Sequence, residues 1–397
     1  MGFHRDDLQK SRDIDYRDKK LEKIAIMAAS DSIILPNYIK ELLKVKKADI
    51  TVVGFQKTQW AKFYKRNHIR YIYIPTAVSK PGDLVYWLRA RLYLLIYKGT
   101  FDFVHVQSAI LTSMVYGDIL NAGKGKMIIT YWGGDIYNKK YQKFRQKKCY
   151  LDKADQLTVM ISDMKEILNK EYQFRYDQKC SVLDFGNVVI DRMGSYLSRY
   201  SEAHLKKIAR QRNHMPQDKI VVAIGYCGRM QQQHIKVINQ ISCFPRDVKK
   251  RMFLYCHMSY GVESERYLAE VGEALKQCGC AYTISEQFMN SSEIALMKIG
   301  VDIFVHAAKF DALSSSMVEY VYAGKKVFNP DWVGYRLRDE LGAQDIVFSD
   351  FEDLGSKLLG ALEDPEWEPS VKERNREAVE WTRSWKYVMP EWVKLYQ

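Results

Sequence analysis

The chain has 397 residues, a formal net charge of +13 at pH 7 and 47% apolar residues. That length predicts two domains, and the ordinary apolar content excludes a disordered, collagen-like or disulfide-stapled small protein. Apolar runs stay far below the roughly 20 residues that span a bilayer, and the first residues lack the apolar core of a secretory signal. We therefore expect neither a transmembrane helix nor a signal peptide. The seven cysteines are odd in number and include no Cys-x-x-Cys, which predicts reduced thiols in the cytoplasm.

The first half of the chain alternates short apolar segments with helical patterns. Buried strands separated by helices are typical of a parallel sheet that is covered on both faces. We expect strands at 23–28, 50–55, 70–74, 103–106, 127–131 and 156–161, with helices at 37–45, 83–97, 111–120 and 162–171.

The same alternation restarts after a polar stretch at 196–218, which predicts a second doubly wound domain. Two such domains that face each other bind ligands in the crevice at the carboxyl ends of their strands. Strands are expected at 220–225, 252–256, 302–306, 326–328 and 345–348, and helices at 262–277, 291–299, 314–323 and 351–362. The expected divisions are a charged arm at 1–22, a Rossmann-like domain at 23–200, a second one at 201–370, and a helix at 371–397 that packs back on the first domain.

The positive charge is concentrated in one part of the first domain. Residues 51–150 carry 17 basic and 4 acidic side chains, which indicates an anionic partner, either nucleic acid or an acidic membrane surface. Aromatic residues accompany the charge at 60–70, 83–97 and 137–150, as expected where rings sit at headgroup depth and cations meet phosphate. No nucleic-acid reading motif is present, so a membrane is favoured. The candidate contacts are Trp87, Arg89, Arg91, Lys139, Lys140 and Lys143; alternatively, 83–97 is a core helix and 137–150 a solvated one.

The most distinctive motif lies at 310–327, after an expected strand. Ser314 and Ser315 are good N-cap residues, so the loop ends at a helix N-terminus that favours a diphosphate. Glu319, one turn into that helix, is placed to accept hydrogen bonds from a ribose diol. Asp311, at the start of the motif, is suited to hold sugar hydroxyls or to face positive charge at an anomeric carbon.

The acid-x7-Glu spacing of Asp311 and Glu319 resembles the Glu-x7-Glu element of retaining GT-B glycosyltransferases. The loops at 102–107 and 129–135 stand where that group has its His-containing and Gly-x-Asp loops. The loops at 225–235 and 259–261 are similar to those of the bacterial family that transfers N-acetylfucosamine to a lipid-linked acceptor. The likeness spans roughly residues 23–362, and this sequence departs from it at four places. Asp311 replaces a Glu, Ala312-Leu313-Ser314 replaces a Gly-rich loop, Gln107 replaces a second His, and the loop at 29–31 lacks a glycine pair.

The resemblance implies a GT-B fold, an α/β architecture of two Rossmann-like domains that face each other across a cleft. It implies a donor site in the second domain and a catalytic group drawn from both domains. Alternatives stay open: His105 as a core histidine, Asp135 as a turn carboxylate, and the cationic candidates as surface side chains. The implied donor-binding residues are Leu313, Ser314, Ser315, Glu319, Arg229, His234, Lys236, Tyr260, Gly261 and Lys309, and the implied catalytic residues are Asp311, His105 and Asp135.

These features predict a glycosyltransferase that uses a UDP-, dTDP- or GDP-linked sugar. The acceptor would be a lipid-linked glycan or a polysaccharide, and the enzyme would lie peripherally on the inner face of the plasma membrane. Neither of the two expected domains has an Asp-x-Asp motif, so we expect no metal or other cofactor. Retention is favoured, and inversion with His105 or Asp135 as base stays open. The alternative is a catalytically degenerate GT-B protein that acts as a membrane-bound partner of another transferase.

Overall fold

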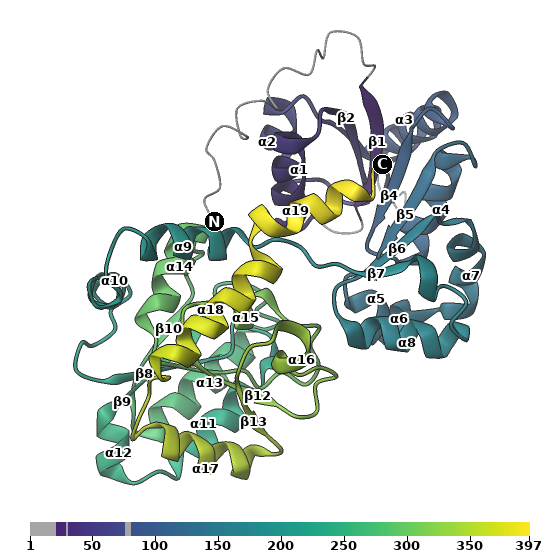
Figure 1. The fold of residues 1–397 in the computed structure, drawn as a ribbon. Helices are drawn as coiled ribbons and strands as arrows, with labels where there is room; N and C mark the ends of the chain where they lie inside the picture. Colours follow the sequence, from purple (N-terminus) through teal and green to yellow (C-terminus); the bar gives the residue numbers. More distant parts are fainter. Residues whose placement is uncertain (1–20, 29–30, 76–80) are drawn as a thin grey trace, which may run out of the picture.

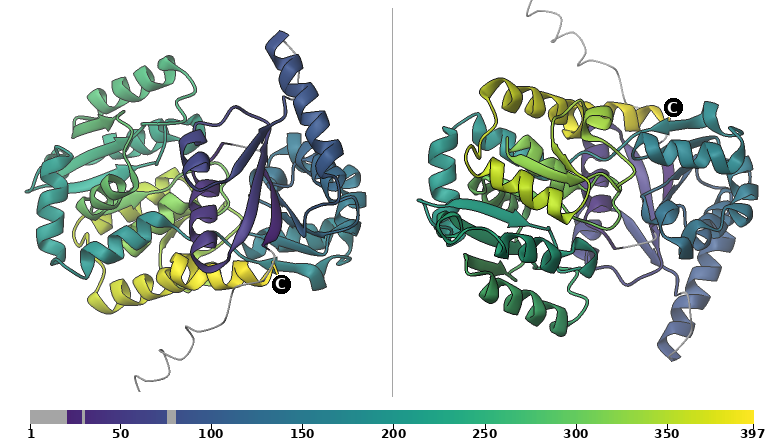
Figure 2. Two further views of the ribbon diagram at one scale, coloured as in Figure 1. Left: turned by 90° about the horizontal axis from the view of Figure 1, so that it is seen from above. Right: turned by 90° about the horizontal axis from the view of Figure 1, so that it is seen from below.

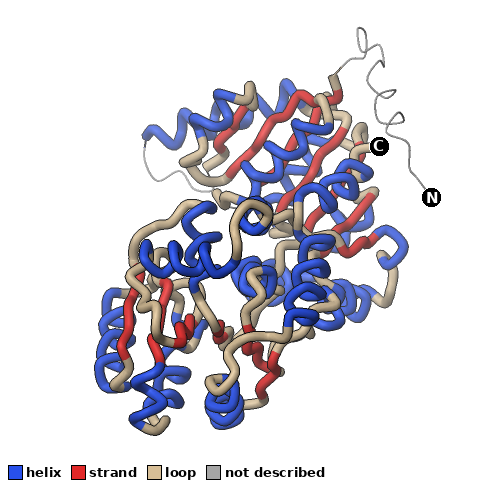
Figure 3. Tube along the Cα trace, turned by 60° about the vertical axis from the view of Figure 1, so that its left-hand side comes forward, coloured by secondary structure: helices blue, strands red, loops and turns tan. Residues whose placement is uncertain are grey.

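The computed structural model describes residues 21–28, 31–75 and 81–397. It contains two α/β domains, each built on a parallel sheet with helices on both faces (Figures 1 and 3). The expected GT-B architecture is confirmed. Most of the expected arm at 1–22 lies outside the described residues.

The amino-terminal domain has a seven-stranded sheet in the order β3-β2-β1-β4-β5-β6-β7. All neighbouring strands are parallel, and β1 lies between β2 and β4 with Ile26 opposite Val52 and His105. The central strands are almost fully buried, as their apolar sequences require. The strands are β1 (Glu22–Ala28), β2 (Ala48–Gly54), β3 (Arg70–Tyr73), β4 (Phe103–Gln107), β5 (Lys126–Thr130), β6 (Gln156–Val159) and β7 (Cys180–Val182).

Helices connect successive strands of this domain, as parallel pairing demands. One of them, α3, extends beyond the rest of the domain (Figure 2). The helices are α1 (Ile34–Val45), α2 (Ala61–Arg66), α3 (Pro81–Tyr97), α4 (Leu111–Asn121), α5 (Gly134–Tyr137), α6 (Lys139–Gln142), α7 (Phe144–Lys153) and α8 (Ser162–Tyr172).

The carboxy-terminal domain repeats this design with six parallel strands in the order β10-β9-β8-β11-β12-β13. Its strands are β8 (Ile220–Ile224), β9 (Met252–His257), β10 (Ala281–Ser285), β11 (Ile303–Val305), β12 (Lys326–Pro330) and β13 (Ile346–Phe348). Its helices are α9 (Val188–Leu197), α10 (Glu202–Arg212), α11 (His234–Ser242), α12 (Arg246–Arg251), α13 (Glu265–Cys278), α14 (Ser291–Gly300), α15 (Ser315–Tyr322), α16 (Leu337–Leu341) and α17 (Phe351–Ala361).

The chain passes between the domains twice, and the two connections lie against each other. The first is 183–187, earlier than the expected boundary near residue 200, because α9 packs on α14 of the second domain. The second joins α18 (Pro369–Arg383) to α19 (Trp385–Lys394). The N–H of Asn187 donates to the carbonyl of Arg383 over 2.6 Å, and the Arg383 guanidinium pairs with Asp184.

The last helix belongs to the core of the first domain, although α18 before it packs on α15 of the second (Figure 1). Trp392 is fully buried; its ring stacks on Phe185 with centroids 4.8 Å apart and meets Tyr38 of α1 edge-on. Its indole N–H donates to the carbonyl of Asp184 over 2.9 Å. The carboxy-terminal segment therefore fixes the first domain to the start of the first connection.

Candidate functional site

The two domains touch through loops that follow strands of their sheets. Gly133, after β5, has φ +97°, and a Cβ added there would lie 2.7 Å from the Cβ of Ala312, after β11. The same junction includes a hydrogen bond of 2.5 Å from the Tyr137 hydroxyl to Asp163. The backbone N–H of Ser162 donates to the carboxylate of Glu340 at 3.0 Å. We call this contact region the domain junction; it brings the expected Gly-Gly-Asp loop beside the acidic loop of the second domain.

Asp311 is held at the domain junction through one of its carboxylate oxygens. Its Oδ2 accepts hydrogen bonds from the backbone N–H of Ser314 and the hydroxyl of Tyr335, both at 2.8 Å. The Nε2 atom of the fully buried His306 lies 3.5 Å from the same oxygen, and its Nδ1 contacts Asn329 at 3.0 Å. No described residue donates to Oδ1. Asp311 is therefore oriented by the protein with one oxygen left for another partner.

The loop after Asp311 ends in the expected helix cap. The Ser314 side chain accepts from the N–H of Met317, so Ser314 is the N-cap of α15. Helix first-turn N–H groups have no partner within the helix, which makes the Ser315 end of α15 suited to an anion. Leu313 is buried with φ +61°, a conformation that normally favours glycine, so this loop keeps the backbone shape expected of a Gly-rich one.

Glu319 differs from its expected role as a ribose contact. Its side chain is buried, with Oε1 accepting from the amide of Asn187 at 2.7 Å and Oε2 from the ammonium of Lys298 at 2.5 Å. Lys298 also donates to the hydroxyl and carbonyl oxygens of Ser316. Burial lowers the pKa of Lys298, and the negative charge of Glu319 opposes that shift. Both carboxylate oxygens are thus engaged inside the protein, and Glu319 supports α15 from behind.

His234 is a second expected donor contact that the structure places beneath the surface. It is fully buried, its Nδ1 lies 3.0 Å from the hydroxyl of Tyr267, and its Nε2 has no hydrogen-bond partner among the described residues. A Cβ at Gly225 would lie 2.5 Å from that Nε2, so the glycine (φ +63°) lets the loop after β8 cross the imidazole. Burial lowers the pKa of His234 to about 4, which keeps the ring neutral at pH 7. His234 supports this loop and carries no charge to a ligand.

Arg229 and Tyr260 are two expected donor residues that are open to solvent. The N–H of Gly228 donates to the carbonyl of Tyr260 over 2.8 Å, so the loops after β8 and β9 lie together. Arg229 is exposed and its side chain crosses Gly261, whose added Cβ would lie 3.0 Å from Cγ of the arginine. The Tyr260 side chain is 45% exposed. These two loops therefore present a cation and an aromatic ring side by side.

The two expected lysines of the donor site lie differently. The Lys236 ammonium sits over the ring of Phe351 on α17, 5.0 Å from its centroid, so it points to a neighbouring helix. Lys309 is exposed, and its backbone N–H donates to the carbonyl of Gln231 over 2.9 Å. That bond ties the acidic loop to the loop after β8.

His105 is enclosed in the first domain, in contrast to the accessible position expected of a catalytic residue. It lies in β4, fully buried, with Nδ1 2.6 Å from the hydroxyl of Tyr396 and Nε2 2.7 Å from that of Thr130. Burial lowers its pKa to about 3. The alternative of a core histidine describes its environment, because the carboxy-terminal segment covers that face of the sheet.

Asp135 is likewise a turn carboxylate in this structure and not an accessible base. It is 2% exposed and accepts three backbone hydrogen bonds, from Ala109 at 2.7 Å, Trp132 at 2.9 Å and Gly133 at 3.0 Å. Burial raises its pKa, while these bonds and the charge of Lys147 oppose the rise. Asp135 therefore fixes the loops after β4 and β5, including the glycine that touches Ala312.

The expected membrane-facing helix, α3, exposes an unusual amount of apolar surface. It packs on the domain through Ala90, Tyr93 and Leu94. Arg89 and Arg91 are exposed beside this surface, and the Arg91 guanidinium lies 4.1 Å from the centre of the Trp87 ring. The exposed apolar side chains of α3 are Leu84, Val85, Tyr86, Leu88, Leu92, Leu95 and Ile96, with exposed fractions from 40% to 76%.

The second basic segment forms two short helices, α6 and α7. Lys139, Lys140 and Lys143 are exposed, whereas Lys147 is buried and donates to the carbonyl of Asp135 over 3.0 Å. Within the described ranges, no helix has the length and apolar content that crossing a membrane requires.

Comparison with known proteins agrees with this architecture. Residues 23–162 match a family model described as glycosyl transferase 4-like. No curated protein matches the chain.

Solved structures of glycosyltransferases share the fold over nearly the whole chain. A glycosyltransferase from Rickettsia africae is 16% identical, with a TM-score of 0.73 over 95% of this chain and 98% of that one. Anabaena HepE, solved with UDP and glucose, is 12% identical, with a TM-score of 0.70 over 94% and 98% of the two chains. WaaG, a glycosyltransferase of lipopolysaccharide biosynthesis, is 13% identical, with a TM-score of 0.64 over 94% and 99%. At these identities the likeness establishes the fold.

Proposed function

We propose that the protein is a glycosyltransferase that moves a sugar from a nucleotide diphosphate to a lipid-linked or polysaccharide acceptor. The carrying observation is the domain junction, where Gly133 of one domain meets the loop of Asp311 in the other. In this proposal the oriented carboxylate and the start of α15 belong to the ligand site, because two doubly wound domains bind ligands where the carboxyl ends of their strands face each other. The match of residues 23–162 to a glycosyltransferase family model supports the same activity.

The donor diphosphate lies, in this proposal, at the start of α15. The Ser314 cap leaves first-turn N–H groups and the positive end of the helix dipole for the anion. Arg229 supplies a mobile cation, and Tyr260 beside it lines the nucleotide pocket. These groups stabilise the departing diphosphate electrostatically, so the proposed reaction uses no metal or other cofactor.

Asp311 acts on the sugar in this proposal. Its Oδ2 is fixed by Ser314 and Tyr335, and its Oδ1 is directed at positive charge that develops at the anomeric carbon. His105 and Asp135, the two bases considered for inversion, are engaged in the protein interior and so do not favour that outcome. Retention is the proposed outcome, and NMR of the newly formed anomer tests it directly.

The acceptor side is assigned to the first domain and to the inner face of the plasma membrane. The exposed apolar residues of α3 and the neighbouring Arg89 and Arg91 suit a helix that lies in an anionic membrane interface. Such placement would bring a lipid-linked acceptor and the domain junction to the same surface.

Thermal denaturation of the purified protein with UDP, GDP or dTDP tests the donor site. A nucleotide that binds the folded state raises the melting temperature. We expect one nucleotide to do so, and the effect to disappear in Arg229→Ala but persist in Lys236→Ala. The second variant is a matched control, because Lys236 is an exposed cation that points to Phe351. If the nucleotide still raised the melting temperature of Arg229→Ala, the assignment of the donor site to these loops would be wrong.

A catalytically degenerate protein is the second candidate. Glu319, the expected ribose contact, is fully engaged by Lys298 and Asn187, and Leu313 replaces glycine in the acidic loop. Such a protein would bind a membrane and a partner transferase without turnover. Failure of all three nucleotides to shift the melting temperature, together with vesicle binding, would favour it.

A further inference from the structure

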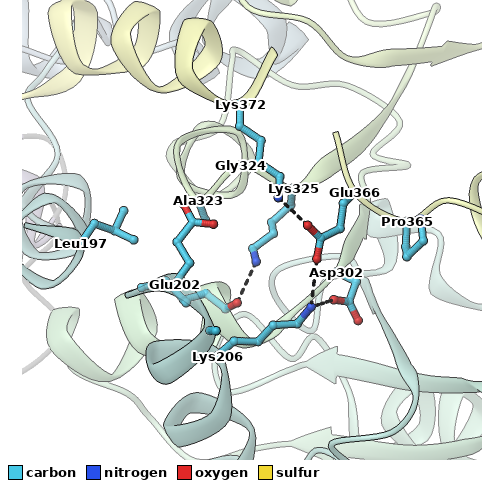
Figure 4. Close-up of a pocket in the computed structure, with 12 residues that line it drawn as sticks. Leu197, Glu202, Lys206, Asp302, Ala323, Gly324, Lys325, Pro365, Glu366 and Lys372 are labelled. Atoms are coloured by element: carbon cyan, nitrogen blue, oxygen red, sulfur yellow. Dashed lines mark hydrogen bonds and ion pairs between the residues drawn. The ribbon is translucent and has the colours of Figure 1, made fainter. Parts of the chain in front are cut away.

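A cavity of about 360 Å³ lies in the second domain at the end opposite Asp311. Asp302 precedes β11 and Lys325 precedes β12, so the cavity opens at the amino ends of strands whose carboxyl ends carry the acidic loop. Its remaining walls come from the end of α9, from α10 and α14, and from the segment that leads into α18 and its first turn (Figure 4). Its volume falls in the usual range of small-ligand sites.

Charged side chains from separate elements converge in this cavity. The Lys206 ammonium lies 2.6 Å from Asp302 and 3.5 Å from Glu366, and Lys372 lies 2.6 Å from Glu366. Figure 4 shows these groups as one chain of ion pairs along the wall. These ion pairs therefore preorganise the side chains that line the cavity.

Lys325 is the cation in this wall that has no carboxylate partner among the described residues. Its ammonium donates to the carbonyl of Ile299 over 2.8 Å, which leaves further N–H donors unused. Burial lowers the pKa of Lys325 to about 8, so the ammonium is still mostly charged at pH 7. Lys325 is half-buried, with two other ammonium groups acting on it and the carboxylates of Asp302 and Glu202 beyond ion-pair distance, so an anion beside it would be stabilising.

The wider network also carries a surplus of positive charge. Behind the wall, Arg210 pairs with Asp302 and Arg376 pairs with Glu202. Five cations thus face three carboxylates in the whole network: Lys206, Arg210, Lys325, Lys372 and Arg376 against Glu202, Asp302 and Glu366.

We propose that this cavity binds a compact polyanion, a phosphate compound or a polycarboxylate, with Lys325 as the principal contact. The ligand would join α10, which follows the first connection between the domains, to α18, which precedes the second. Its binding would therefore hold together a helix that lies beyond the first connection and the helix that leads into the second. This site is separate from the donor site and does not depend on the proposed transferase activity.

Calorimetric titration of the full chain with pyrophosphate and with citrate, at constant ionic strength, tests the proposal. We expect at least one of them to bind, and the affinity to fall at least tenfold in Lys325→Met. Lys326→Met is the matched control, because that neighbouring ammonium points instead to the carbonyl of Asp364 and the ring of Trp367. The two anions distinguish a phosphate ligand from a carboxylate one.

Pyrophosphate also suits the start of α15, so a second readout locates it. Mass spectrometry after brief amine acetylation at pH 8 reports each lysine separately. The bound anion should slow acetylation of Lys325 severalfold and leave Lys326 unchanged. Absence of binding by both anions, equal affinity in the two methionine variants, or binding without protection of Lys325 would each overturn the proposal.

Discussion

The ammonium of Lys298 and the carboxylate of Glu319 lie 2.5 Å apart, and both side chains are buried. The amide of Asn187, from the first connection between the domains, donates to the other oxygen of the same carboxylate. One buried ion pair thus joins α14, α15 and the segment that leads into the second domain. Glu319, the glutamate of the acid-x7-Glu spacing, therefore supports α15, the helix that begins at the domain junction.

Removal of one member of this pair should destabilise the protein strongly. Lys298→Met leaves the Glu319 carboxylate buried without its cation, and such a loss typically costs about 3–5 kcal/mol of unfolding free energy. Lys298→Met combined with Glu319→Met should recover much of that loss, because no unpaired charge remains. Urea denaturation of the single and double variants measures both effects. Equal instability of the two would show that the ion pair is not the cause.

An exposed ion pair provides the control for that experiment. Lys170 and Glu166 lie one turn apart on the surface of α8, 2.7 Å from each other. Solvent screens such a pair, so Lys170→Met should leave the denaturation midpoint almost unchanged.

The histidines of the core predict that stability falls in mild acid. The folded-state pKa is about 3 for His105 and about 4 for His234, both lowered by burial from the ordinary value of about 6.5. Between the folded-state and the ordinary pKa values, these histidines bind more protons in the unfolded chain than in the folded protein. Their contribution to the unfolding free energy is therefore complete above about pH 6.5 and decreases as the pH falls. Asp345 opposes this, because burial raises its pKa to about 6.

Variants separate these contributions in urea denaturation between pH 4.5 and 7.5. His234→Gln should make the dependence shallower by up to about 1.4 kcal/mol per pH unit, the free energy linked to one proton. Asp345→Asn should make it steeper. An unchanged slope in His234→Gln would mean that this histidine has the same pKa in the folded and unfolded protein.

Most of the fold was predictable because its central strands are continuous apolar runs. The strands expected at 23–28, 103–106 and 252–256 occur as β1, β4 and β9, with boundaries that differ by one residue. The edge strands β7 and β10 were not predicted, since both are partly exposed and lack such a run. Helix α10 lies within the expected polar stretch because few of its residues are buried.

The site was less predictable, because it depends on contacts between distant parts of the chain. The sequence places His105 on a strand, but it gives no sign that Tyr396, far along the chain, packs against this side chain and encloses it. Lys298 lies in the apolar second half of α14, and its pairing with Glu319 has no signal in the local pattern. The positive φ of Leu313 has no sequence signal either, since a positive φ is normally indicated by glycine.

Loss of the Tyr335 hydroxyl should impair transfer more than donor binding. Tyr335→Phe removes the hydrogen bond to Oδ2 of Asp311, and a bond to a charged group contributes about 1.5–3 kcal/mol. If that bond orients the catalytic carboxylate, kcat should fall roughly 10- to 100-fold, while the nucleotide-induced shift in melting temperature persists. Tyr282→Phe is the control, because Tyr282 lies on the edge strand β10, away from Asp311, and its variant should keep a normal kcat. Loss of both properties together would instead indicate a general defect of folding.

The exposed face of α3 should determine attachment to vesicles. Leu88, Leu92 and Leu95 are between 54% and 76% exposed, and transfer of a leucine side chain from water to an apolar phase contributes about 1.5–3 kcal/mol when complete. Replacing all three by serine should therefore weaken binding to vesicles of phosphatidylglycerol and phosphatidylcholine at least tenfold. Co-sedimentation measures this.

The two arginines of α3 should act through charge instead. Arg89→Gln with Arg91→Gln should weaken binding to the anionic vesicles, flatten its dependence on salt, and leave binding to neutral vesicles unchanged. Phe174→Ser, which alters an equally exposed apolar residue beyond the end of α8, should have no effect. If the serine variant bound vesicles normally but eluted as a smaller species in size-exclusion chromatography, α3 would be a contact between copies of the chain and the membrane assignment would be wrong.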